Sequence, residues 1–115
     1  MNIRTSLIGR VRVLSVTARV DQEHAKALEI ALAPYLLNCT TKGEPIVLDF
    51  VGVDYISSVG LRVLLLAAKQ VKNQGGRIAI AALTPVVAEV FKVSRFDLVL
   101  TVFASVALAS VELAA

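Results

Sequence analysis

Hydrophobic and polar side chains alternate along the first part of the chain, which is the pattern of β-strands. Two such stretches, 3–8 and 11–16, are predicted strands. In the second, valines alternate with Arg12 and Ser15, as on a sheet with one buried face. A Gly-Arg dipeptide separates them, and glycine at the first of two turn residues favours a tight hairpin. The chain is therefore predicted to begin with an antiparallel hairpin.

After residue 20, the apolar residues recur every three to four positions, which is the spacing of a helix. Asp21 is the predicted N-cap, and Glu23 falls in the first turn, where the helix dipole favours an anion. Pro34 is predicted to kink this helix or to end its regular part early. The apolar positions that recur at helical spacing are Ala25, Leu28, Ala31, Leu32, Tyr35 and Leu36.

Strands and helices alternate in the rest of the chain. The predicted elements are a loop at 40–45, a strand at 46–50, a helix from Ser58 to about Asn73, a strand at 77–83, a helix capped by Thr84 with Pro85 at its first position, a strand at 98–103 and a closing helix. The order ββαβαβαβα predicts a single α/β domain, residues 1–115. Its sheet is mixed and mostly parallel, with an N-terminal hairpin and about four helices.

Composition narrows the class of protein. Hydrophobic residues make up 57% of the 115 residues, which excludes a disordered chain. The apolar run from Val63 to Ala68 is far shorter than the roughly 20 residues of a membrane span, so no membrane insertion is expected. A lone cysteine cannot form an internal disulfide and suits a reducing compartment, so we expect a cytoplasmic protein. The net charge of +3 comes from scattered basic residues, which predicts no nucleic-acid binding.

One region is locally more basic than the whole chain. Residues 55–88 contain Arg62, Lys69, Lys72 and Arg77 and no acidic residue. This distribution predicts that the region carries a positive face.

The stretch "DYISSVGLRVLL", residues 54–65, is the candidate functional segment. It places Asp54, Ser57 and Ser58 after the third strand, where functional groups collect in open α/β sheets. Two interpretations of the serines remain open: an N-cap for the helix, or the acceptor of a chemical modification. Gly60 disfavours a helix by about 1 kcal/mol relative to alanine, which is explained if backbone or a partner must approach closely.

The residues give no support for catalysis. The chain has no G-x-S-x-G motif, and "SSVG" lacks the glycine run and lysine of a phosphate loop. His24 and Cys39 are the sole histidine and cysteine, and nothing in the sequence places them together. We therefore predict no enzymatic activity, no cofactor and no metal site.

The chain resembles a known family over nearly its whole length. Residues 47–97, "VLDFVGVDYISSVGLRVLLLAAKQVKNQGGRIAIAALTPVVAEVFKVSRFD", resemble the core of a STAS domain, the fold of bacterial anti-sigma factor antagonists. The element "VTARVD", residues 16–21, is similar to the family's L-T-G-x-L-D, with Ala18 in place of the glycine. This resemblance implies an anti-anti-sigma factor that acts by partner switching in bacterial transcription or signal transduction.

The resemblance also implies particular partners and a modification site. In the family, the antagonist binds an anti-sigma factor serine kinase, which phosphorylates it and is thereby released, and a PP2C-type phosphatase resets the switch. The acceptor lies two residues before the Gly-Leu pair, which here is Gly60-Leu61, so the phosphorylated residue is expected to be Ser58. The family often has Asp directly before the acceptor, whereas this chain has Ser57, which becomes the second choice.

The residues expected to contact a partner surround this serine pair. They are Asp21, Asp49, Asp54, Ser57, Gly60, Arg62, Leu66 and Lys69. Asp21 and Asp49 match polar positions of the family, but a capping role and a strand-end role remain equally open. Leu66 falls among polar positions of its helix and is either a docking contact or an ordinary surface leucine.

Two other functions remain open from the sequence. One is a STAS subunit of a transporter or multiprotein signalling complex that is never phosphorylated. The other is a small nucleotide-binding or enzymatic α/β domain.

Overall fold

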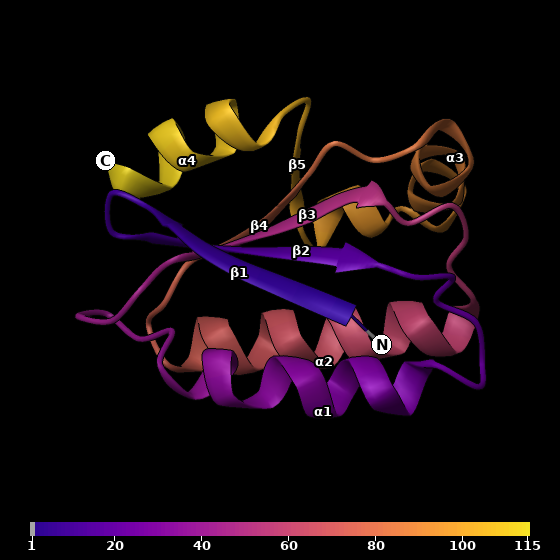
Figure 1. Ribbon diagram of the computed structural model, residues 1–115, viewed down its shortest axis with the longest axis horizontal. Helices are drawn as coiled ribbons and strands as arrows, with labels where there is room; N and C mark the ends of the chain where they lie inside the picture. Colours follow the sequence, from indigo (N-terminus) through magenta and orange to yellow (C-terminus); the bar gives the residue numbers. More distant parts are fainter. Residues whose placement is uncertain (1) are drawn as a thin grey trace.

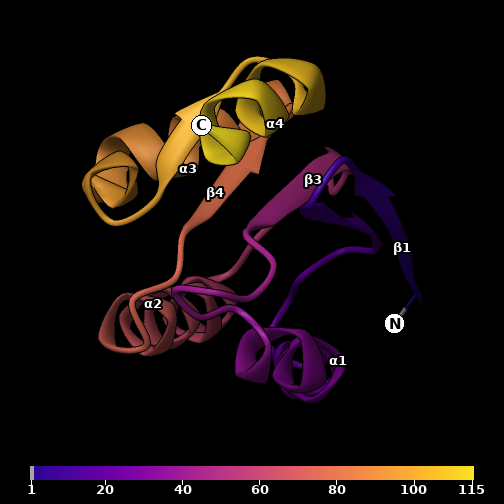
Figure 2. The ribbon, with the colours of Figure 1, turned by 90° about the vertical axis from the view of Figure 1, so that its left-hand side faces the viewer.

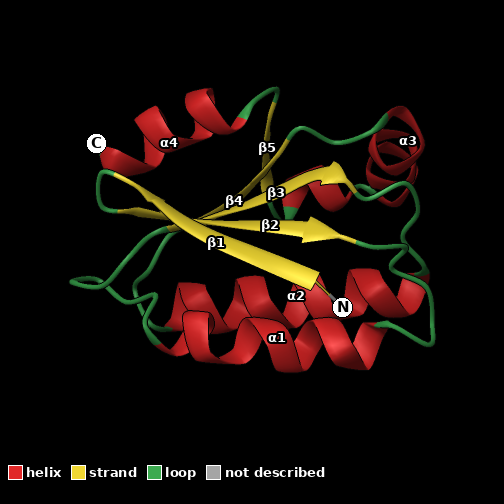
Figure 3. Ribbon diagram, viewed as in Figure 1, coloured by secondary structure: helices red, strands yellow, loops and turns green. Residues whose placement is uncertain are grey.

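The computed structural model describes residues 2–115 and has the predicted element order. Figure 1 shows the elements, and Figure 3 distinguishes helices from strands. Their bounds are β1 Asn2–Ile8, β2 Val11–Thr17, α1 Ala25–Leu37, β3 Ile46–Gly52, α2 Ser58–Asn73, β4 Ile78–Ala81, α3 Pro85–Ser94, a 3-10 turn η1 Phe96–Leu98, β5 Thr101–Phe103 and α4 Val106–Ala114.

The sheet has the order β1-β2-β3-β4-β5. β1 and β2 pair in antiparallel fashion from Asn2↔Thr17 to Ile8↔Val11, and the remaining neighbours are parallel. Gly9 in the hairpin turn has a φ of 61°, a conformation that glycine adopts without strain. The predicted hairpin and the mostly parallel sheet are both confirmed.

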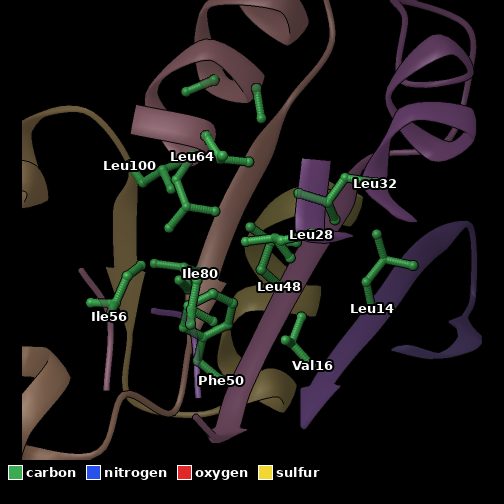
Figure 4. Packing of buried hydrophobic residues seen from close by; sticks show 14 of the residues in the cluster. Leu14, Val16, Leu28, Leu32, Leu48, Phe50, Ile56, Leu64, Ile80 and Leu100 are labelled. Carbon is green, nitrogen blue, oxygen red and sulfur yellow. The ribbon is translucent and has the colours of Figure 1, made fainter. Parts of the chain in front are cut away.

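Helices cover both faces of the sheet. α1 and α2 lie side by side against one face, and α4 lies against the other (Figure 2). The larger core packs strand residues such as Leu48 and Phe50 against Leu28, Leu32 and Leu64 of the two helices (Figure 4). A smaller cluster lies under α4 and consists of Val11, Val13, Val47, Ala79, Ala81, Ala109 and Leu113.

The expectation of one buried face was wrong for β2. Val11 and Val13 are buried in the cluster under α4, whereas Leu14 and Val16 are buried on the α1 and α2 side. The reason is that α4 crosses back over the sheet and contacts β2, β3, β4 and β5. Within residues 2–115, no helix is both long enough and apolar enough to span a bilayer.

The start of α1 also differs from the prediction. Residues 22–24 form a turn, and the helix begins at Ala25 with His24 at the N-cap position. Asp21 is therefore not the N-cap, and Glu23 lies outside the helix. Pro34 lies inside α1, which continues to Leu37 without ending at the proline.

The last two strands are shorter than predicted, and the cap of α3 also differs. β4 is Ile78–Ala81, whereas a strand at 77–83 was predicted. The last strand begins at Thr101 because Phe96–Leu98 forms a 3-10 turn, entered through Arg95 with a left-handed φ of 57°. Thr84 occupies the N-cap position of α3, with Pro85 first in the helix. Its hydroxyl does not cap the helix but donates to the carbonyl of Val53 at 2.8 Å, which ties α3 to the loop before α2.

Candidate functional site

The serine pair lies at the edge of the sheet where the parallel strands end. The loops after β2 and β3 meet there, beside the starts of α1 and α2 (Figure 1). Val20 and Ile56 form an isolated parallel bridge between these loops. The Val20 amide donates to the Tyr55 carbonyl at 2.9 Å, and the Ser57 amide donates to the Val20 carbonyl at 2.8 Å. These bonds fix the entry into α2 directly before Ser58.

The two serines have different roles. Ser57 is the N-cap of α2, with extended backbone at φ −86° and ψ 170°, and its Oγ accepts from the Gly60 amide at 3.1 Å. Ser58 is the first residue of the helix, and its side chain is exposed. Within residues 2–115 the Ser58 hydroxyl makes no hydrogen bond. The cap and the accessible hydroxyl are thus adjacent but separate residues.

Gly60 is buried beneath this junction. A Cβ at Gly60 would lie 2.7 Å from Val20 Cγ1 and 2.9 Å from Ile56 Cγ1. Close approach therefore explains the glycine, and the neighbour is the chain's own bridge. Because Gly60 is buried, it has no surface to offer a partner, and its role is to let the bridge pack against α2.

Asp21 organises the loop between β2 and α1. Its Oδ1 accepts from the His24 backbone amide at 3.0 Å and lies 2.6 Å from His24 Nδ1. Arg19 Nε lies 3.8 Å from the other carboxylate oxygen. The side-chain hydrogen bond with His24, followed by the backbone bond and the nearby positive charges, holds the pKa of Asp21 below its usual value. Asp21 thus has a structural task in the loop.

Arg19 and Tyr55 form a contact that the sequence analysis missed. The Arg19 guanidinium carbon lies 4.1 Å from the centroid of the Tyr55 ring, which is the geometry of a cation–π interaction. The two residues are far apart in the sequence and come together because Val20 and Ile56 pair. The only sequence signal is an arginine and a tyrosine that each precede a residue of that bridge.

Asp49 and Asp54 occupy different surroundings. Asp49 lies within β3, where it accepts from Ser15 Oγ at 2.9 Å and from the Val51 amide at 3.2 Å. Its side chain shares a strand face with Val47 and points to the α4 side, opposite to α2. Asp54 is exposed in the loop before α2 and forms no ion pair with any described residue. The structure therefore places Asp54, but not Asp49, beside the serines in the same loop.

α2 presents a mixed outer face. Leu64, Ala68 and Val71 are buried against the sheet. Arg62 and Lys69 are exposed, and neither forms an ion pair within residues 2–115. Leu66 is 46% exposed between them. The predicted positive face is thus present and has an apolar centre.

Other reactive side chains lie apart from the serines or have structural partners. Cys39 is buried after the end of α1; burial raises the pKa of its thiol, and its Sγ donates to the Arg77 carbonyl at 3.2 Å. Among the described residues, one group has ligand atoms close enough for a metal ion: Asp21, Glu23 and His24, within 4.8 Å. The Asp21–His24 hydrogen bond accounts for the closeness of two of these three residues.

Comparisons with known proteins find a matching family model and a curated relative. The family model described as "Mlab, STAS domain" matches residues 3–102. The Bordetella bronchiseptica protein named "Putative anti-sigma factor antagonist BtrV" is 38% identical over 97 residues, which cover 84% of this chain and 80% of the relative.

Solved structures show the same fold. An anti-sigma factor antagonist from Mycobacterium paratuberculosis has a TM-score of 0.86 at 20% identity, covering 99% of this chain and 94% of that one. The Bacillus cell fate determinant SpoIIAA, in its phosphorylated form, has a TM-score of 0.66 at 14% identity, covering 94% and 96% of the two chains.

Proposed function

Because this chain belongs to the STAS domain family, we propose that it is an anti-sigma factor antagonist whose binding is ended by phosphorylation of Ser58. In its unphosphorylated form it binds an anti-sigma factor that is also a serine kinase. Its own residues supply the acceptor hydroxyl and the docking surface, while catalysis belongs to the partners. We place this exchange in the cytoplasm, where ATP is available to the kinase.

The observation that carries the proposal is the exposed, unbonded hydroxyl of Ser58 at the start of α2. A kinase has to reach the acceptor oxygen, and Ser58 offers it without breaking any bond of the fold. The Ser57 Oγ is already engaged as the acceptor of the Gly60 amide, so modification of Ser57 would have to rearrange this cap. Ser58 is therefore the proposed acceptor, and Ser57 is the second choice.

The chemistry of the switch is a pair of group transfers at one oxygen. The kinase moves the γ-phosphoryl group of ATP to Ser58 Oγ; the O–H proton leaves and ADP is released. The PP2C-type phosphatase then cleaves the Oγ–P bond with water, which returns the serine hydroxyl and inorganic phosphate. No group of this chain is oxidised or reduced in either step.

The fold tolerates the added charge. A phosphoserine carries about −1.5 to −2 charges at neutral pH, and free amides at a helix N-terminus favour an anion. The first turn of α2 contains no acidic side chain, and exposed Arg62 lies one turn further along the helix. We expect the phosphorylated domain to stay folded, so the phosphate acts on the partner and not on the fold.

The partner's surface determines the difference in affinity between the phosphorylated and the unphosphorylated chain. A partner surface that suits the basic side of α2 carries carboxylates, and a dianion at Ser58 brings like charges together. A loss of about 100-fold in affinity corresponds to only about 2.8 kcal/mol, which one phosphate can supply.

A capture experiment tests the proposal. Tagged wild type, Ser58→Ala, Ser58→Asp and, as a matched control, Ser57→Ala are used to capture partners from extract of the native cell. We expect an anti-sigma factor serine kinase with wild type, Ser58→Ala and Ser57→Ala, and its loss with Ser58→Asp. The captured kinase should phosphorylate wild type and Ser57→Ala with ATP, but not Ser58→Ala.

A second measurement distinguishes the phosphorylation switch from a purely structural role of the chain. Mass spectrometry of the chain isolated from its native cell should find phosphate on Ser58 in part of the population. A chain that never carries phosphate, and a partner that is retained equally by Ser58→Asp, would instead identify a STAS subunit of a constitutive complex.

A further inference from the structure

A groove runs along α1 and α2 on the side away from the sheet. It consists of two adjoining hollows of about 410 and 290 Å³. Both are lined by Glu29, Val63 and Leu66, so together they form one continuous depression between the helices. Its first end reaches Val59 and Arg62 in the first turns of α2, next to Ser58.

The groove has an apolar floor, and its polar side chains gather at the end near Ser58, where Gln22, Lys26 and Arg62 line it. Leu32, Val63 and Ala67 are buried at its base. Leu66 is 46% exposed at its centre and Leu37 is 70% exposed at its far end. These side chains give an elongated surface that is open to solvent and has the character of a docking site.

The two sides of the groove differ in charge. On α1, Lys26 Nζ lies 2.8 Å from Glu29 Oε1, so the two charges are paired. On α2, Arg62 lines the groove, and Lys69 is exposed on the same helix outside the lining residues. Neither forms an ion pair within residues 2–115, and α2 contains no acidic residue. The groove is therefore complementary to a ligand with an apolar stripe flanked by carboxylates.

We propose that this groove binds an acidic amphipathic helix of the anti-sigma factor. The identity of that partner rests on the function proposed above. Apolar side chains of the helix, spaced i, i+3 or i+4 and i+7, contact Leu66 and its neighbours, and Asp or Glu side chains face Arg62 and Lys69.

The shape of the groove favours a helix over an extended peptide. α1 and α2 both run back from the carboxyl edge of the sheet and lie side by side (Figure 1). With 13 residues in α1, the groove is about 20 Å long, which matches about four turns of a third helix. The small side chains of Ala33 and Ala67 leave room for another helix to approach closely.

The position of Ser58 connects the groove to the switch. A phosphate on Ser58 stands at the end of the groove formed by Val59 and Arg62. It competes with the partner's carboxylates for Arg62 and repels them directly. An acidic helix in the groove thus explains why one phosphate is sufficient to release the partner.

A defined peptide tests the groove directly. The probe is a designed amphipathic helix of about 18 residues, roughly five turns, with a leucine stripe flanked by glutamates, and its control has lysines in place of the glutamates. Each peptide is titrated into the ¹⁵N-labelled full chain. We expect amide shifts on α1 and α2 around Leu66, and affinity at least about tenfold tighter for the glutamate peptide.

Two surface variants and a titration with lipid vesicles serve as controls for the peptide experiment. Leu66→Asp should abolish binding of the glutamate peptide, while Leu108→Asp on α4, where Leu108 is 57% exposed, should leave it unchanged. Circular dichroism checks that both variants are folded. Vesicles of phosphatidylglycerol should give no shifts in the groove; shifts there would instead assign the surface to anionic membranes.

The proposal is overturned if neither peptide binds, if both bind equally well, or if the shifts lie away from the groove. Its failure is distinguishable from failure of the proposed function. If Leu66→Asp retains the anti-sigma factor that Ser58→Asp loses, the phosphorylation switch holds and the partner docks elsewhere.

Discussion

The two edges of the sheet use their polar groups differently. At the amino edge, polar side chains bind the chain's own backbone: Gln74 Nε2 donates to the carbonyls of Leu36 at 2.8 Å and Cys39 at 2.9 Å. Arg77 Nη1 likewise donates to the Leu113 carbonyl at 3.2 Å, which attaches α4. These groups have internal partners and hold the loops between helices and strands together.

At the carboxyl edge, polar groups remain available. Asp54, Ser58 and Arg62 are exposed and make no hydrogen bond or ion pair with a described side chain. The bonds that shape this edge come from the backbone of Val20, from the Ser57 cap, and from the side chains of Thr84 and Asp21. The comparison shows that one set of polar groups stabilises the fold, while a neighbouring set stays exposed and is not needed for it.

The largest expected effect is at the amino edge. Gly76→Ala would place a Cβ against the backbone carbonyl of Cys39, which cannot move without shifting the end of α1. We expect a loss of about 3 kcal/mol in the free energy of unfolding, at the upper end of overpacking costs. Urea denaturation measures it. Gly9→Ala is the control, because its Cβ meets nothing within 4 Å and only the positive φ adds strain; an equal loss in both variants would contradict the contact.

The matching change at the carboxyl edge should have a smaller effect. Gly60→Ala would meet the Val20 side chain at 2.7 Å, and a side chain yields more readily than backbone. We expect a loss of about 1–2 kcal/mol in urea denaturation. Partner binding should fall with it, because displacement of Val20 moves the entry into α2. A Gly60→Ala protein with full stability and full binding would show that the junction is not tightly packed.

The two serines at the carboxyl edge should differ in how much each contributes to stability. Ser57→Ala removes the bond to the Gly60 amide and should lower the free energy of unfolding by about 1 kcal/mol. Ser58→Ala removes no bond of the fold and should change stability by less than about 0.5 kcal/mol. Thermal melts compare the two. If Ser58→Ala is the more destabilising variant, the assignment of cap and free hydroxyl is reversed.

The smallest effect is the pH dependence at Asp21. The hydrogen bonds from His24 and the charge of Arg19 lower the pKa of Asp21 in the folded state. Its contribution to stability is therefore present above the unfolded value of 3.8 and is lost as the pH falls through the lower folded pKa. Asp21→Asn should abolish this part of the acid dependence in urea denaturation at a series of pH values. An unchanged acid profile would show that the carboxylate is not held by its neighbours.

Most of the fold followed from the sequence because strong local signals agreed with the tertiary structure. The hairpin was predictable from the glycine at its turn, and α2 from the serines before it. The start of α1 was not predictable, because Asp21 followed by polar residues fits a helix cap and the observed turn equally well.

The site was predictable in position but not in detail. Either serine of the pair fits the sequence pattern of an N-cap. The structure shows that Ser57 is the cap, because its backbone is extended and its Oγ accepts from the Gly60 amide. The contact between Arg19 and Tyr55 depends on a bridge between two loops that leaves no periodic signal in the sequence. Likewise, the exposure of Leu66 was visible by helical projection, whereas the groove required the placement of α1 beside α2.

The most direct measurement compares the chain with and without phosphoserine at position 58. Phosphoserine is incorporated genetically, and calorimetry measures the affinity for the captured anti-sigma factor alongside a thermal melt of each form. We predict that the phosphorylated chain binds about 100-fold more weakly, which is about 2.8 kcal/mol, while its melting temperature is nearly unchanged. Equal affinity of the two forms, or loss of binding only because the phosphorylated domain has unfolded, would contradict the account.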